Sequence, residues 1–185
     1  MTRFAAYLTL ALNFFIVEPA LANETRGPGP AHIRSDHHDL LDAVEAGSRS
    51  SATFERLVQR LGASDVIVYL VYDFAPLPGV AARISFLSTA GGWRYLRVSI
   101  DPKYTGCQRL ALLGHEFEHA VEIAEAAAVV DASSLAALYR QIGFRSGADH
   151  EDRFDTLDAI RAGWQIQLEA GRQPPSRLSG VTRPE

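Results

Sequence analysis

Cysteine is almost absent from this 185-residue chain, in which Cys107 is the only one. A single cysteine excludes an intramolecular disulfide, so stability has to come from packing and, where one binds, from a metal. The lone thiol is expected to be a small buried hydrophobe rather than a nucleophile. The chain also lacks a large net charge, since its formal net charge is only −4 at pH 7. This mildly acidic balance argues against nucleic acid or an anionic membrane as the main partner.

A long apolar run is also missing. The most apolar stretch, residues 4–17, is shorter than the roughly 20 residues that a membrane-spanning helix needs. Arg3 precedes it, and small residues at Ala20 and Ala22 follow it, as in a secretory signal peptide. We therefore expect residues 1–22 to be a signal peptide and the mature protein to be periplasmic or secreted, without stable membrane insertion. An uncleaved anchor is the alternative.

The sequence after this stretch contains no internal repeat and no sign of a second domain. Residues 23–50 begin polar and rich in glycine and proline, so we expect an extended polar lead-in there. Residues 51–171 are expected to form a single domain, and residues 172–185 a flexible tail. Hydrophobic periodicity predicts, in order, a helix at 51–62, a strand at 66–72, a hairpin turning at 90–92, and helices at 108–130, at 133–142 and downstream of residue 150.

One helix, three strands and three helices in this order define an α+β fold. We expect a small, three-stranded and mainly antiparallel sheet, because Gly91-Gly92 separates two alternating segments as in a hairpin. A helical half follows it. The apolar stripe of its long helix comprises Leu110, Leu113, Phe117, Val121 and Ala124. The inner face of the last helix is expected to carry Phe154, Leu157, Ile160 or Arg161, Trp164 and Leu168.

The long helix contains the motif His115-Glu116-Phe117-Glu118-His119. Residues four apart share one helix face, so the imidazoles of His115 and His119 can reach one Zn²⁺ at about 2.0–2.1 Å. Glu116 lies next to the first ligand, where its carboxylate would act as the general base toward a metal-bound water. Zinc would activate that water and polarise a scissile carbonyl. The alternative is a helix that carries two ordinary histidines.

A catalytic zinc needs a third protein ligand. Glu122 shares the face of the two histidines but lies a further turn along the helix, which favours a role outside the ligand set. In the last predicted helix, Glu151, Asp155 and Asp158 have the spacing i, i+4, i+7 and so share a face. One of these carboxylates would bind the metal, and another would orient a histidine N–H. The alternative is that all three form the solvated side of an amphipathic helix.

A resemblance to known proteins spans Ser51 to Glu169 and rests on five stretches: SATFERLVQRLGASDVIVYLV, AGGWRYLRVSID, LLGHEFEHAVEIAE, LYRQIGF and RFDTLDA. The motif helix with a carboxylate helix downstream resembles the zincin metallopeptidases, and is nearer their Glu-ligand branch than their three-histidine branch. The five stretches together resemble a group of uncharacterised exported bacterial proteins expected to be metallopeptidases. The resemblance implies that Asp155 is the third ligand, with Glu151 in reserve. That group has Glu where this chain has Asp155, and the shorter side chain requires a closer approach of the two helices.

These features predict an exported zinc-dependent hydrolase, a small metallopeptidase with one catalytic Zn²⁺ that acts on a peptide or protein. His115, His119 and Asp155 would hold the metal, and Glu116 would be the general base. Further candidates, which would orient the ligands or stabilise an oxyanion, are Asp158, His150 and Tyr139. A binding module without turnover, zinc-stabilised or metal-free, is the alternative from another class. A lyase or a non-peptide hydrolase would use the same ligands, and no oligomeric state is implied.

Overall fold

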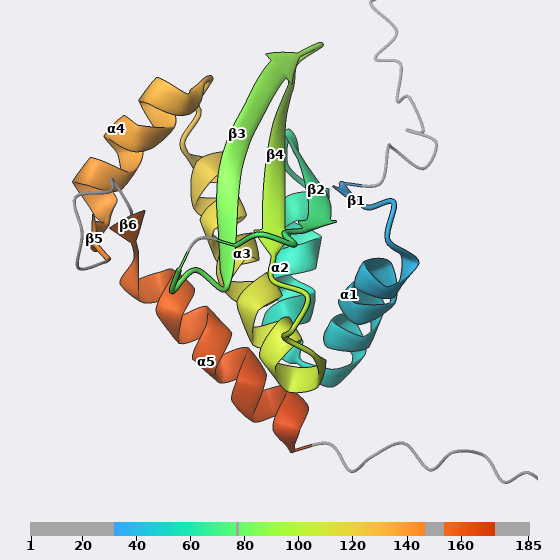
Figure 1. Ribbon diagram of the computed structural model, residues 1–185. Coiled ribbons are helices and arrows are strands. Elements are labelled where there is room, and N and C mark those ends of the chain that lie inside the picture. Colours follow the sequence, from blue (N-terminus) through green and yellow to red (C-terminus); the bar gives the residue numbers. More distant parts are fainter. Residues whose placement is uncertain (1–31, 77, 147–153, 173–185) are drawn as a thin grey trace, which may run out of the picture.

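The computed structural model describes residues 32–76, 78–146 and 154–172, in which runs of helices and runs of strands follow one another (Figure 1). The fold class is α+β, as predicted. The signal peptide expected at 1–22 and nearly all of the tail expected at 172–185 lie outside the described residues. The elements are, in order, β1 (Ile33–Arg34), α1 (His38–Ser50), α2 (Ala52–Gly62), β2 (Val66–Tyr72), β3 (Ala82–Ala90), β4 (Trp93–Ile100), α3 (Gly106–Glu125), α4 (Ala132–Ile142), β5 (Phe144–Arg145), β6 (Phe154–Asp155) and α5 (Leu157–Gly171).

The main sheet has four strands in the order β1-β2-β4-β3, and it is mixed. β2 pairs in parallel with β1 and with β4, and only β3 and β4 are antiparallel. Burial explains this order, because β2 and β4 are mostly buried and take the centre, while the largely exposed β3 takes an edge. The expectation of three mainly antiparallel strands is therefore wrong. It treated neighbours in the sequence as neighbours in the sheet, and it missed β1.

The hairpin of β3 and β4 forms where the sequence predicts it. Its two-residue turn, Gly91-Gly92, has φ angles of 57° and 77°, which glycine adopts without steric strain. The register shifts between Phe86 and Ser88, so this part of β3 is irregular. The hairpin contacts α3 and α4, which lie beside β3 in Figure 1.

Helix α1 corrects the expectation of an extended lead-in at 23–50 for residues 38–50, whereas residues 23–31 of that segment lie outside the described residues. Leu40 and Gly47 are buried two turns apart, and Val44 between them packs against the same core. A Cβ on Gly47 would lie 2.9 Å from the Phe54 ring, so this glycine lets α1 approach α2 closely. The polar composition of the segment hid the helical spacing of its few apolar residues.

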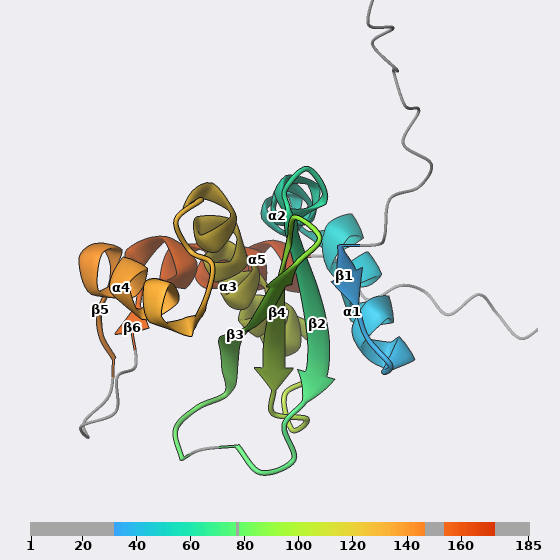
Figure 2. The same ribbon diagram turned by 90° about the horizontal axis from the view of Figure 1, so that it is seen from above.

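Helix α3 runs behind the sheet and occupies the centre of the core (Figures 1 and 2). Leu113, Phe117 and Ile123 of α3 are fully buried, and the Phe117 ring centroid lies 5.4 Å from that of Phe54 in α2. The helix ends at Glu125, five residues earlier than predicted. Cys107, in its first turn, is half-buried and packs against the core, so it is less enclosed than expected.

The end of α3 is held by Arg94 of β4, a buried residue that the sequence did not single out. Its guanidinium donates to both carboxylate oxygens of Asp65. It also donates to the backbone carbonyls of Ile123, Ala124, Ala126 and Val129. One side chain thus satisfies carbonyls that a helix C-terminus leaves without intrahelical partners.

Helix α5 packs closely along α3. A Cβ on Gly114 would overlap Cδ1 of Ile166, and a Cβ on Gly163 would lie 3.1 Å from the Ala111 carbonyl oxygen. The two glycines therefore let the helix backbones approach to a distance that larger side chains would prevent.

The face that α5 buries differs from the predicted one. Leu157, Trp164 and Leu168 are 58%, 73% and 53% exposed. The buried residues are Ala159, Ala162, Gly163, Ile166 and Ala170. Close packing requires small residues at the helix contact. The prediction chose the face with the largest apolar side chains and was therefore wrong. No helix in the described ranges is long and apolar enough to cross a membrane.

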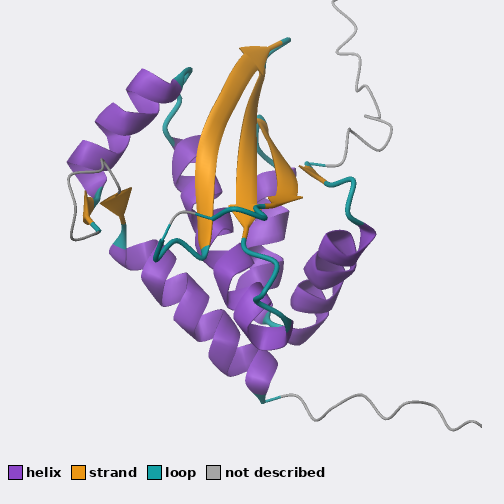
Figure 3. Ribbon diagram, in the orientation of Figure 1, coloured by secondary structure: helices purple, strands orange, loops and turns teal. Residues whose placement is uncertain are grey.

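A two-stranded antiparallel sheet of β5 and β6 lies apart from the main sheet, between the end of α4 and the start of α5 (Figure 3). Gly143 permits this pairing, because a Cβ there would lie 2.7 Å from the Asp155 carbonyl oxygen. The sequence gives little signal for strands of two residues, and this sheet was not predicted. It fixes the backbone at Asp155.

Candidate metal centre

Helix α3 carries His115 and His119 one turn apart on one face. Their rings meet edge to face, with centroids 4.8 Å apart. His119 is buried and only 4% exposed, whereas the side chain of His115 is 24% exposed. The pair therefore lies at the wall of the core, with one imidazole enclosed and the other partly open to solvent.

Asp155 joins these histidines and completes a group of three side chains that can hold a metal ion. Its Oδ1 lies 3.4 Å from His115 Nε2 and 3.6 Å from His119 Nε2. Two ligands that are about 2.0–2.1 Å from one zinc ion and subtend a tetrahedral angle are about 3.3–3.4 Å apart. Both distances therefore fit a shared ion, and two imidazoles with one carboxylate are a donor set that zinc accepts.

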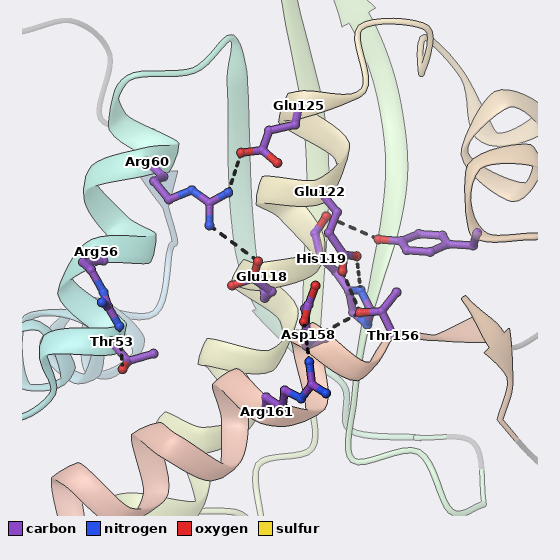
Figure 4. Close-up of polar contacts among 12 residues, drawn as sticks. Thr53, Arg56, Arg60, Glu118, His119, Glu122, Glu125, Thr156, Asp158 and Arg161 are labelled. Carbon is purple, nitrogen blue, oxygen red and sulfur yellow. Dashed lines mark hydrogen bonds and ion pairs between the residues drawn. The ribbon is translucent and has the colours of Figure 1, made fainter. Parts of the chain in front are cut away.

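The other predicted carboxylates do not join this group. Asp155 ends β6 and precedes α5, so it does not share a helix face with Asp158 as expected. The Asp158 side chain is 73% exposed and pairs with Arg161 at 3.2 Å, so the expected role beside the metal is wrong for it (Figure 4). Glu151, the reserve ligand, and His150, the candidate oxyanion donor, lie outside the described residues.

Glu122 lies behind His119, outside the ligand group. Its Oε2 is 2.8 Å from Nδ1 of His119 (Figure 4). Nε2 of the same ring faces Asp155. An ionised carboxylate can only accept, so Nδ1 carries the proton in this pair. That tautomer leaves the Nε2 lone pair free for a metal, the arrangement in which a carboxylate orients a metal-ligating histidine.

Thr156 contacts the same carboxylate from the other side, and sequence reasoning missed it. Its hydroxyl donates to Glu122 Oε1 at 2.6 Å and accepts from the Ala159 backbone N–H at 3.1 Å. The second bond makes Thr156 the N-cap of α5. A threonine before a helical pattern was the available signal, but its contact with Glu122 joins residues 34 positions apart and depends on the fold.

Tyr139, a candidate oxyanion donor, is buried against α3 from α4. Its hydroxyl donates to the His119 carbonyl oxygen at 3.3 Å. Burial, followed by the nearby carboxylates of Glu122 and Glu116, raises the pKa of Tyr139. The hydroxyl therefore stays protonated and helps to hold α4 against α3. The sequence did not indicate this hydrogen bond between Tyr139 and the backbone of His119.

Glu116 is 5% exposed and follows His115 directly on α3. Burial raises the pKa of its carboxyl to about 7, and Asp155 adds to this while His119 opposes it. A base works best when its pKa is near the working pH, because it then exchanges a proton readily in both directions. Glu116 is thus suited to accept and return a proton near neutral pH.

The charges around the two histidines favour a cation between them. Burial, and then the neighbouring His119, lowers the pKa of His115. Burial also acts to lower the pKa of His119, but hydrogen bonds to Asp155 and Glu122 outweigh it and raise this pKa to about 9. The enclosed carboxylates therefore stabilise positive charge at His119, as a proton or as a metal.

A cavity of about 690 Å³ opens onto this group of residues. His115, Glu116, His119 and Asp155 form one side of it. The start of β3 forms another side through Ala82, Arg83 and Ile84. Leu135, Ala136 and Tyr139 of α4 also line it. The three candidate ligands and the buried glutamate therefore face one shared space.

No protein-family model, no curated protein and no solved structure matches this chain. The resemblance to zincins, and to exported bacterial proteins, accordingly stays a prediction from the sequence.

Proposed function

We propose that this protein is a zinc-dependent hydrolase, a small zincin-like metallopeptidase that works after export. The observation that carries the proposal is the position of Asp155, whose Oδ1 lies within 3.4 and 3.6 Å of one nitrogen on each of two histidines. The buried Glu116 beside them adds a base to a set of ligands.

Each residue of the site has its own part in this proposal. His115, His119 and Asp155 would hold one zinc ion. When bound, zinc lowers the pKa of water and polarises a carbonyl group. Glu116 would take the proton of the attacking water and deliver it to the leaving amine. Glu122 keeps the His119 ring in the ligating tautomer.

The substrate class in this proposal is an extended peptide. β3 is an edge strand, and its first residues line the cavity beside the candidate ligands. An edge strand offers unpaired backbone groups, to which an extended peptide can add as a further strand. A peptide added there would run past Glu116 and the histidine pair, which brings a backbone carbonyl to the reacting groups.

The proposal is tested first by metal content. The purified protein should contain about one zinc per chain, since three protein ligands hold one catalytic zinc. His115→Ala should lose the metal, whereas His38→Ala, a change at an exposed histidine, should retain it. A wild-type protein that stays metal-free after purification with zinc would contradict the proposal.

Turnover is tested separately. Glu116→Gln should retain zinc and the fold but lose hydrolysis of an unstructured protein such as casein, because it removes only the proton acceptor. Equal activity of Glu116→Gln and wild type would contradict Glu116 as the base. A protein that binds zinc, hydrolyses nothing and unfolds on chelation would instead be the zinc-stabilised binding module.

A further inference from the structure

We propose that Thr156 is a positioning residue of this metal centre. It holds the candidate ligand Asp155, and it also holds Glu122, the carboxylate that contacts the candidate ligand His119. The inference rests on the metal binding proposed above and goes beyond the ligand set. Thr156 is 4% exposed and lies at the junction of β6 and α5. From there its side chain and its backbone reach two different parts of the site.

The side chain acts on His119 through Glu122. The Thr156 hydroxyl donates to Glu122 Oε1 at 2.6 Å, and Glu122 Oε2 lies 2.8 Å from His119 Nδ1. Both carboxylate oxygens are thereby occupied as acceptors. A glutamate side chain has three rotatable bonds, so a hydrogen bond to its far oxygen fixes the oxygen that faces the imidazole. The hydroxyl therefore orients the His119 ring through Glu122.

The backbone acts on Asp155. The Thr156 N–H donates to Asp155 Oδ1 at 2.7 Å, and this oxygen is the atom that faces both histidines. The position of Thr156 is in turn fixed by its N-cap bond with Ala159. One residue thus ties the start of α5, the carboxylate ligand and the histidine ligand into one arrangement.

A simpler role would be that Thr156 only caps α5. Ser51 supplies a matched control for that role, because it makes the same contacts at the start of α2. Its hydroxyl accepts from the Phe54 N–H at 3.0 Å and donates to Glu169 Oε2 at 2.6 Å. Glu169 is 13 residues from Thr156 along α5, which at 1.5 Å per residue is about 20 Å from the metal centre. If Thr156 acted only as a helix cap, its loss should change zinc binding as little or as much as the loss of the Ser51 cap.

The test measures the zinc dissociation constant by competition with a chromophoric chelator, on full-length variants whose fold is checked by circular dichroism. Thr156→Val keeps the shape and the backbone N–H but removes the hydroxyl. It should weaken zinc binding by about 10–100-fold, the usual effect of losing a partner that orients a ligand. Thr156→Ser should bind zinc as tightly as the wild type, and so should Ser51→Ala.

Glu122→Gln tests the pathway of this effect. A glutamine removes the negative charge behind His119 and keeps only one acceptor oxygen, so it should weaken zinc binding at least as much as Thr156→Val does. If the hydroxyl acts through Glu122, combining the two substitutions should weaken binding no more than Glu122→Gln alone.

Three results would overturn the inference. Zinc binding by Thr156→Val as tight as in the wild type would remove the positioning role and leave the proposed function intact. Equal losses in Thr156→Val and Ser51→Ala would reduce Thr156 to a helix cap. A wild-type protein that binds no zinc would refute the metal centre itself, and the positioning role with it.

Discussion

Replacement of Arg94 by methionine should weaken the end of the helix that carries the candidate ligands. The guanidinium makes six hydrogen bonds, of which four go to backbone carbonyls at or beyond the end of α3. Methionine fills a similar volume but donates nothing, so these carbonyls lose a charged donor in a buried place.

The size of the stability loss depends on which hydrogen bonds these carbonyls keep without Arg94. The carbonyls of Ile123 and Ala126 still accept backbone N–H groups, so their loss is small. Ala124 and Val129 lose their bonds to Arg94, at about 1–2 kcal/mol each. The Asp65 side chain is 47% exposed, so water replaces its ion pair and adds at most about 1 kcal/mol. We expect the free energy of unfolding to fall by about 2–5 kcal/mol, a large part of the 5–15 kcal/mol that is typical of a whole domain.

The assay is urea unfolding followed by circular dichroism in the presence of a chelator, because a bound metal would add its own stabilisation. Arg97→Met is the control, since Arg97 is exposed on the same strand and its replacement should change stability by less than about 0.5 kcal/mol. A loss below about 1 kcal/mol for Arg94→Met would refute the view that this guanidinium holds the end of α3.

Two further changes test the packing beside the site and an electrostatic contact at the start of α2. Gly143→Ala would place a Cβ 2.7 Å from the Asp155 carbonyl oxygen and 2.9 Å from that of Tyr139, so β6 has to move. Zinc affinity measured by chelator competition should fall about 10-fold or more, whereas Gly62→Ala, at an open position, should leave it unchanged; equal affinities would contradict a packing limit at β6. Burial acts to raise the pKa of Glu169, but hydrogen bonds from Ser51, Gln165 and Thr53 outweigh it and lower this pKa from 4.5 to about 2. Because the folded pKa is the lower one, the stabilisation is complete above about pH 4.5 and disappears as the pH falls through about 2. The difference in unfolding free energy between wild type and Glu169→Gln should therefore be largest near neutral pH and shrink steadily below about pH 4.5, and a difference that is constant with pH would exclude this cause.

The local parts of the site could be predicted from the sequence. His115 and His119 share a face because four residues make about one helical turn, and this depends on nothing outside α3. The β3–β4 hairpin is local in the same sense, because Gly91-Gly92 supplies its turn. These features need only a period and a turn, which a sequence displays directly.

The parts that depend on distant contacts were less predictable. Asp155 was named through a resemblance, yet it was placed on a helix and lies instead at the end of β6. The role of Arg94 depends on β4 lying beneath the end of α3, and that of Thr156 on Glu122 34 residues away. A hydrogen bond between elements far apart in the sequence leaves no periodic trace in either of them.

Close backbone packing bears on the proposed ligand Asp155, which stands where the resemblance implies a longer acid. Asp155 has one methylene fewer than glutamate, so its backbone has to lie nearer the histidines. Gly163 lets α5 approach α3, since a Cβ there would lie only 3.1 Å from the Ala111 carbonyl oxygen, one turn before His115, and Gly143 lets β5 approach the Asp155 backbone. The glycines and the short acid therefore depend on one another. If Asp155 were replaced by glutamate in this backbone, its carboxylate would project into the space between His115 and His119 that the metal is expected to occupy.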